Sequence, residues 1–250
     1  MGLQWVILHE IQSIQAQPIN DIAVLLSFLG NYSTYMYLTA LVMWWYGHQQ
    51  GQKVALLMFL TMGFTDLIKT MVHSTRPIGV PGILSKYTES AAGASFPSGH
   101  AMVSTVYYVT IARYVRRIGR ILLLFMPLAI GLSRLYLGVH WPIDVLAGWV
   151  IGTTIAFLPL SSAVLWPLIL LLLTFTPFVQ DTVSFGRFVA TCWLLFAVWP
   201  WENQGHSVRK MVVGTIFFAG LGSLSLVVPY AIWWLPFAAG LLVHLVGKMV

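Results

Sequence analysis

Long apolar runs separated by polar breaks make up most of this chain. A helix that crosses a membrane needs about 20 mostly apolar residues, and runs of that kind recur from residue 27 onward. They predict nine spanning helices and therefore an all-α, polytopic transmembrane helical bundle. The predicted spans cover residues 27–47, 53–72, 99–117, 120–138, 143–159, 163–179, 184–200, 210–227 and 229–247.

Residues 1–26, before the first span, have a different pattern. Apolar side chains recur there at helical spacing, at Trp5, Leu8, Ile11 and Ile14, and polar residues lie between them. This spacing predicts an amphipathic helix that lies in the membrane interface. A soluble N-terminal arm is the open alternative.

Composition supports the membrane assignment. Of the 250 residues, 58% are hydrophobic and 8% are charged, whereas soluble domains carry about 25% charged residues. We therefore expect an integral membrane protein. The net charge of +6 does not indicate a nucleic-acid partner, because Lys and Arg mainly set orientation in such proteins. Cys192 is the single cysteine and cannot form an internal disulfide, and no cleavable signal peptide is expected.

Three polar clusters interrupt the apolar pattern. Together they hold three cations, one carboxylate, a Ser-Gly turn and the histidines His100 and His140, with His73 also inside the first cluster. Charge is costly in an apolar chain, so its concentration in three places predicts a functional site. The first cluster runs from Lys69 to Pro77, the second from Pro97 to His100, and the third from Ser133 to Asp144.

Five of these residues suit the binding of a phosphate group. Arg76 and Arg134 offer rigid forks of N–H donors that match phosphate oxygens, and Lys69 adds a mobile charge. Ser98 and Gly99 lie at the start of a predicted span, where the first backbone N–H groups of a helix attract anions. The Ser98 hydroxyl adds a donor, and Gly99 lets the backbone approach a ligand closely.

The two histidines suit different steps of phosphoryl transfer. Asp144 follows His140 by four positions, so its carboxylate can reach the imidazole, fix the tautomer and leave the other nitrogen free to attack. His100 is then available as general acid. Two alternatives stay open. Single cations can snorkel to the interface, and His140, Asp144 and His100 could form a metal site, although the surrounding cations disfavour it.

In the nine-span arrangement all three clusters lie on one side of the membrane. Five of the thirteen Lys and Arg residues share that side and eight lie opposite, so the positive-inside rule makes the opposite side cytoplasmic. We expect the N-terminus outside, the C-terminus in the cytoplasm and the clusters at the outer face. The eight are Lys53, Arg113, Arg116, Arg117, Arg120, Arg209, Lys210 and Lys248, and the five are Lys69, Arg76, Lys86, Arg134 and Arg187.

In order and spacing, the clusters match the signature of the type 2 phosphatidic acid phosphatase superfamily, the lipid phosphate phosphatases. That signature is Lys-x6-Arg-Pro, Pro-Ser-Gly-His and Ser-Arg-x5-His-x3-Asp, and every fixed position is met. The residues around His140 resemble those of bacterial members, which implies a bacterial inner membrane and a periplasmic active site. The resemblance implies a phosphatase without metal or other cofactor that hydrolyses a lipid phosphate or pyrophosphate through a phosphohistidine.

The resemblance also implies a role for each matched residue. The implied phosphate-binding residues are Lys69, Arg76, Ser98, Gly99 and Arg134. The implied catalytic residues are His140 as nucleophile, His100 as general acid and Asp144 as the group that orients His140.

The resemblance further divides the chain into three parts. Residues 1–26 would precede a six-span phosphatase core over 27–179, and residues 180–250 would form a transmembrane extension that departs from the six-span pattern. Phosphatidic acid, phosphatidylglycerophosphate, isoprenyl pyrophosphate and sphingoid phosphates are candidate substrates, and membrane lipids are the expected partners. A lipid phosphotransferase and a non-catalytic phospholipid transporter or binding protein stay open as alternatives. The oligomeric state is not predicted.

Overall fold

The computed structural model describes residues 2–14 and 16–159, and this part of the chain is helical without any β-strand. The predicted all-α class is confirmed for these residues. The predicted spans from 163 onward, and with them the C-terminal extension, lie outside the described residues. The helices are α1 (Leu3–Ile11), α2 (Gln17–Leu29), α3 (Tyr32–Tyr46), α4 (His48–Val72), the short 3-10 helix η1 (Thr88–Ser90), α5 (Gly99–Ala112), α6 (Arg117–Tyr136) and α7 (Pro142–Phe157).

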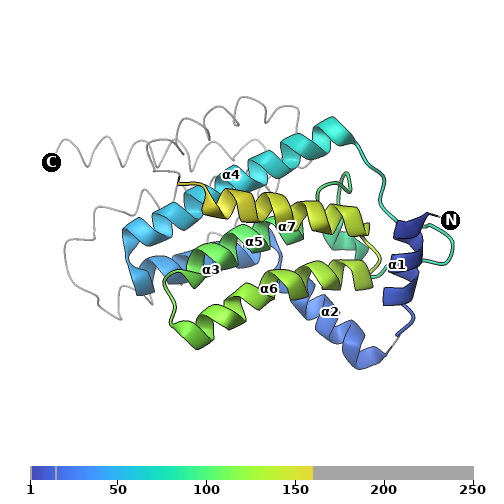
Figure 1. Cartoon of the computed structure of the whole chain (residues 1–250), viewed down its shortest axis with the longest axis horizontal. Coiled ribbons are helices and arrows are strands. Elements are labelled where there is room, and N and C mark those ends of the chain that lie inside the picture. The colour runs from blue at the N-terminus through green and yellow to red at the C-terminus, as the bar shows by residue number, and fades with distance from the viewer. Residues whose placement is uncertain (1, 15, 160–250) are drawn as a thin grey trace, which may run out of the picture.

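Helix α5 is the centre of the bundle. It packs against α4, α6 and α7, and nearly all of its residues are buried. Helices α3 to α7 run along the long axis of the molecule, and α1 lies at one end of it (Figure 1). The predicted third span, 99–117, ends earlier, because α5 stops at Ala112 and a turn leads into α6.

Small residues let α7 lie close against α5. A Cβ atom added at Gly148 would lie 2.8 Å from the Ser98 carbonyl oxygen, and one at Gly152 would lie 2.6 Å from that of Met102. Glycines commonly permit such close contacts between membrane helices. Because Gly148 faces the start of α5 and Gly152 faces the next turn, the two helices run in the same direction. Their N-termini therefore lie together.

The predicted first span, 27–47, is divided in the structure. Helix α2 ends at Leu29 and α3 begins at Tyr32. Gly30 and Asn31 form the break, and both are residues that favour helix ends over helix interiors. By length and composition, Lys53–Val72 within α4 and Arg117–Tyr136 are able to cross a membrane.

Helix α1 lies where the sequence predicts an N-terminal amphipathic helix, and Trp5, Leu8 and Ile11 pack against the protein. Ile14 is 64% exposed, and a position in the membrane interface stays a prediction. Leu8 is fully buried in a cluster with Ile83 and Leu135. Gln12 ties the helix down further, because its Nε2 donates to the carbonyl oxygens of Leu84 (2.7 Å) and Tyr136 (2.9 Å). Its Oε1 accepts from the Leu84 N–H at 3.0 Å.

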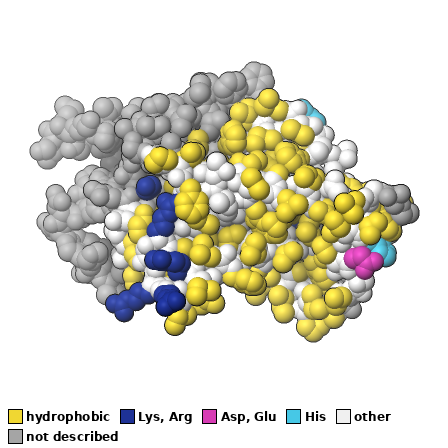
Figure 2. All heavy atoms as spheres, viewed as in Figure 1, with side chains coloured by type: hydrophobic (Ala, Val, Ile, Leu, Met, Phe, Trp, Pro, Cys, Tyr) yellow, Lys and Arg dark blue, Asp and Glu magenta, His cyan; other side chains and the backbone are white. Residues whose placement is uncertain are grey.

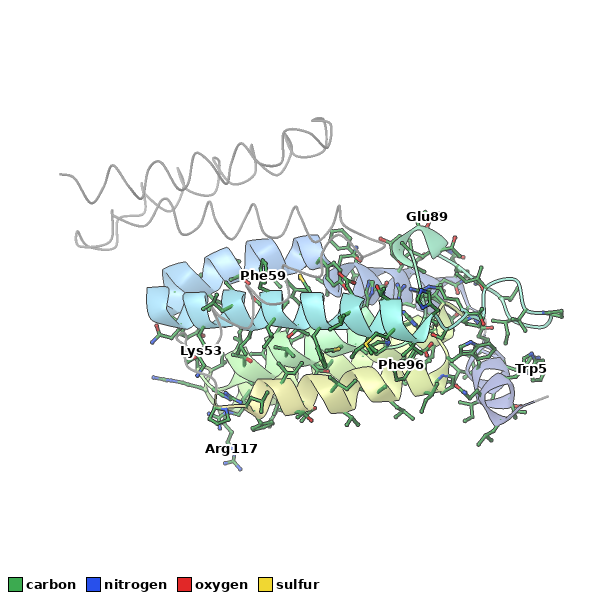
Figure 3. The ribbon with its side chains drawn as sticks, turned by 90° about the horizontal axis from the view of Figure 1, so that it is seen from above. Trp5, Lys53, Phe59, Glu89, Phe96 and Arg117 are labelled. Carbon is green, nitrogen blue, oxygen red and sulfur yellow. The ribbon has the colours of Figure 1, made fainter. Side chains whose placement is uncertain are left out.

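The two ends of the bundle differ in their charged residues. Lys53 and Arg117 lie at one end, and Glu89 and Phe96 lie at the other (Figure 3). Figure 2 shows Lys and Arg side chains gathered at the first end and apolar side chains over much of the remaining surface of that face. The end of α4 and the starts of α5 and α7 lie at the second end, so the three clusters meet there.

Candidate active site

The loop between α4 and α5 is held in place at both of its ends. Ser74 accepts the Ser95 N–H through its carbonyl oxygen (2.9 Å) and the Phe96 N–H through its Oγ (2.7 Å), which closes the loop on itself. In the middle, the Lys86 N–H donates to the Leu137 carbonyl oxygen at 2.9 Å. The loop is therefore fixed against the turn that joins α6 to α7.

His140 and Asp144 form a buried pair at the start of α7. The His140 Nδ1 lies 3.4 Å from the Asp144 Oδ2, and each residue is 1% exposed. The same carboxylate oxygen accepts from the Ser95 Oγ at 2.5 Å and from the Trp141 N–H at 2.8 Å. Pro142 begins the helix, and Asp144 occupies its first turn, where a carboxylate can accept from the backbone.

Ser95 is a site residue that the sequence analysis missed. Its hydroxyl lies between the pair, 2.5 Å from the Asp144 Oδ2 and 3.4 Å from the His140 Nδ1. It stands outside all three clusters, and nothing in its spacing marks it. Only the closure of the loop brings it to the carboxylate.

Arg76 contacts the other nitrogen of His140. Its Nη1 lies 3.0 Å from the His140 Nε2 and farther, 3.5 Å, from the Nδ1. A guanidinium can only donate, so the Nε2 accepts and the ring proton is on the Nδ1, toward Asp144. Burial lowers the pKa of His140 well below its usual value, and the charges of Arg76 and Arg134 lower it further. His140 is therefore neutral at neutral pH.

The remaining donors of Arg76 hold the backbone around the site. They reach the carbonyl oxygens of Ala92 (2.9 Å), Gly93 (3.0 Å), Ala94 (3.1 Å) and Val139 (2.8 Å). Burial lowers the pKa of Arg76 to about 10, so it keeps its charge at neutral pH. Sequence analysis predicts phosphate binding for this residue, and the structure adds a second task, which is to organise the loop.

Arg134 is a fully buried cation, with 0% exposure. Its Nη1 donates to the hydroxyls of Ser27 and Ser90, and its Nη2 lies 3.3 Å from the Ser90 carbonyl oxygen. In the described part of the chain, the Arg134 Nε and the Ser98 Oγ are buried without a hydrogen-bond partner. Buried donors normally have partners, and a phosphate oxygen would suit both.

The other predicted phosphate-binding residues lie at helix ends. Lys69 occupies the last turn of α4, and its charge contributes to the lowered pKa of His140. Ser98 precedes α5 and donates its N–H to the Asp144 carbonyl oxygen at 2.9 Å. A Cβ atom at Gly99 would lie 2.7 Å from the Tyr32 hydroxyl, so glycine is needed here for close packing.

His100 lies in the first turn of α5, close to the other groups. Its charged form lowers the pKa of His140, as do the three cations. Its Nε2 lies 2.9 Å from the Asn31 Oδ1, in the turn between α2 and α3. Asn31 is the second residue that sequence analysis missed. Among residues 2–14 and 16–159, no three His, Cys, Asp or Glu side chains are grouped so that they could hold a metal ion.

These features describe a helical protein in which three cations and two histidines with different partners lie at one end of the bundle. Residues 50–166 match the family model of the PAP2 superfamily, which confirms the resemblance seen in the sequence. The chain belongs to the PAP2 superfamily. Two of its described helices are long and apolar enough to cross a membrane, and with 58% hydrophobic and 8% charged residues the chain has the composition of an integral membrane protein.

Individual relatives agree with this assignment. An undecaprenyl-diphosphatase of Sulfolobus acidocaldarius is 28% identical over 58% of this chain and 70% of its own. The undecaprenyl-diphosphatase BcrC of Bacillus subtilis is 32% identical over 52% of this chain and 69% of its own. The predicted enzyme class, a phosphoric ester or diphosphate hydrolase, is thereby confirmed.

A solved structure shows the same fold. The transmembrane PAP2-type phosphatidylglycerolphosphate phosphatase of Bacillus subtilis superposes with a TM-score of 0.55 at 23% sequence identity. The similarity covers 62% of this chain and 81% of that one. At this level of identity it supports the fold of the described helices.

Proposed function

We propose that this protein hydrolyses a lipid phosphate or pyrophosphate through a phosphohistidine formed on His140. The observation that carries the proposal is that the two nitrogens of this imidazole face different partners. Its Nδ1 faces the Asp144 carboxylate at 3.4 Å, and its Nε2 faces the cations, with Arg76 at 3.0 Å. The Nε2 lone pair therefore points to the place where an anionic phosphate would be held.

The proposed reaction has two steps. The phosphate displaces the Arg76 Nη1 from the Nε2 and takes over its donor. Arg134 and Lys69 neutralise the other oxygens, and the Ser98 hydroxyl and the Gly99 N–H donate to them. The Nε2–P bond forms while the bond from phosphorus to the leaving oxygen breaks, and His100 gives that oxygen a proton. Water then gives a proton back to His100 as its oxygen attacks phosphorus, and the Nε2–P bond breaks. Inorganic phosphate leaves, and His140 returns to its neutral form.

Asp144 and Ser95 would act on His140 during this cycle. The imidazole becomes positively charged when it is phosphorylated at the Nε2, because the Nδ1 keeps its proton. The Asp144 carboxylate stabilises that charge and holds the ring. Ser95 and the Trp141 N–H hold the carboxylate in turn.

We infer that the site faces the outside of a bacterial inner membrane, that the N-terminus is outside and that the C-terminus is cytoplasmic. The support is the gathering of Arg113, Arg116, Arg117 and Arg120 at the opposite end of the bundle. The lipid tail would remain in the bilayer beside the helices. Among the candidate substrates, the names of the relatives favour an isoprenyl diphosphate, followed by phosphatidylglycerophosphate.

The test is a panel of lipid phosphates and diphosphates assayed for phosphate release by the purified protein and its His140→Ala variant. We expect turnover of at least one lipid, and a loss of at least about 10³-fold in the variant. Acid-labile phosphate bound to the wild-type protein during single turnover would identify the intermediate. Full activity of the variant would contradict the mechanism, and phosphate recovered on a second lipid would favour transfer over hydrolysis.

A further inference from the structure

The general acid proposed above is in contact with a residue outside all three clusters. The Asn31 Oδ1 lies 2.9 Å from the His100 Nε2, across a separation of 69 positions in the sequence. Asn31 also precedes residues 50–166, the part of the chain that matches the family model. The contact therefore joins a residue within the matched part of the chain to one outside it.

Asn31 lies at the start of α3, where an asparagine side chain usually caps its own helix. Its carbonyl oxygen accepts from the Thr34 N–H (3.1 Å) and the Tyr35 N–H (3.4 Å), so Asn31 is the N-cap of α3. An N-cap asparagine usually directs its side-chain oxygen to the backbone of its own helix. Here that oxygen is within hydrogen-bond distance of a ring nitrogen on α5.

The turn is packed closely enough to fix the orientation of the ring. A Cβ atom at Gly30 would lie 2.9 Å from the His100 Cδ2. The edge of the ring formed by the Cδ2 and the Nε2 is thus held against the turn. The opposite edge, which carries the Nδ1, faces away from it.

We propose that Asn31 is a positioning residue for His100: it accepts the Nε2–H and so directs the Nδ1–H to the leaving oxygen of the substrate. This proposal rests on the proposed function, in which His100 is the general acid. The two histidines then differ in their partners. His140 has a carboxylate, which stabilises a charged ring, whereas His100 has a neutral amide, which orients the ring without holding its proton strongly.

The first experiment compares leaving groups. An alkyl phosphate, such as a short-chain phosphatidic acid, needs a proton on its leaving oxygen, whereas p-nitrophenyl phosphate does not. We expect Asn31→Leu to lower turnover of the alkyl phosphate about 10- to 100-fold, as supporting hydrogen bonds do elsewhere, and that of p-nitrophenyl phosphate less than about 3-fold. His100→Ala should show the same preference more strongly, and Asn31→Leu should cause no further loss in that background.

The second experiment uses Asn31→Asp, which keeps the shape of the side chain and the helix cap. A carboxylate at this distance stabilises the charged form of His100, so the alkaline limb of the pH–rate profile should move up by about 1 pH unit. Asn20→Asp is the matched control. Its amide oxygen accepts from Lys86 and Tyr136, and its substitution should leave both the limb and the leaving-group preference unchanged.

The outcomes separate the two proposals. If His100→Ala lowers turnover of both substrates equally, His100 is not the general acid, and the roles of both residues are overturned. If His100→Ala discriminates between the substrates but Asn31→Leu does not, or if the limb stays in place in Asn31→Asp, the role of Asn31 alone is overturned.

Discussion

Arginines occur at both ends of the described helical bundle, and the two groups are used in opposite ways. Arg113, Arg116, Arg117 and Arg120 are all exposed. Two of them donate to carbonyl oxygens at helix ends, Arg113 to Ala156 and Arg120 to Ala112. At the other end, Arg134 is fully buried between two hydroxyls.

The difference shows which charges must have a function. An exposed arginine near a helix C-terminus costs little and gains from the helix dipole, so orientation in the membrane is a sufficient reason for it. A buried guanidinium that is held only by neutral groups loses much of its hydration. A fold that keeps such a residue gains something else from it, and the proposed gain is the binding of a phosphate.

The largest effect should come from replacing the buried cation. Arg134→Gln removes a charge that would lie against the phosphate, and we expect turnover to fall about 10²- to 10³-fold. Arg117→Gln, at the other end, should change turnover less than about 2-fold. Phosphate release by the two purified variants measures this. Comparable losses would mean that the two groups of arginines do not differ in function.

The dependence on pH comes next. Because the pKa of His140 lies well below 6.5, activity should persist below pH 6.5 and fall only when His140 becomes protonated. The same shift means that the neutral ring contributes stability above pH 6.5, and this is lost as the pH falls below that value. The rate of enzyme phosphorylation, measured before the steady state between pH 4 and 10, gives the acid limb of the pH–rate profile. An acid limb at or above 6.5 would contradict the environment of His140.

The alkaline limb of the pH–rate profile distinguishes the effects of Arg76 and His100. Arg76, with a pKa of about 10, keeps its charge at neutral pH. A fall in activity that begins well below pH 10 would therefore not be due to Arg76, and we assign it to the proposed general acid, His100. A profile that is flat up to pH 10 and falls beyond it would instead be due to Arg76, and would contradict acid catalysis by His100.

A smaller effect is expected from the hydroxyl that supports the pair. Ser95→Ala removes a 2.5 Å hydrogen bond to the Asp144 carboxylate but leaves the bond from the Trp141 N–H. Turnover should fall about 10-fold. Ser85→Ala is a control in the same loop, since its hydroxyl donates to the Gly138 carbonyl oxygen. An equal effect of the two changes would assign Ser95 to loop stability alone.

Sequence analysis predicted the all-α class and the helices α4, α6 and α7 within a few residues, because long apolar runs are typical of membrane helices. It did not predict the division of the first span or the early end of α5. It also brought together the residues that the structure places around His140. The contact between His140 and Asp144 could be predicted from their spacing, because side chains four positions apart can meet. The roles of these residues in the reaction stay a proposal.

What the sequence could not show depends on long-range contacts. Ser95 reaches Asp144 only because the loop is closed by Ser74, and Asn31 reaches His100 only because α2 and α3 are separate helices. The prediction of a single span over 27–47 did not take the Gly30-Asn31 pair as a break. The carbonyl contacts of Arg76 are likewise invisible in a motif, because backbone oxygens have no sequence signature.

Gln12 has a consequence for the order in which the protein is made. Its side chain bonds to Leu84 and to Tyr136, which follow it by 72 and 124 positions. During synthesis the N-terminal helix emerges first, yet neither acceptor exists until much later. These hydrogen bonds can form only after residues 84 and 136 have been synthesised, so the final docking of α1 is a late event in biogenesis.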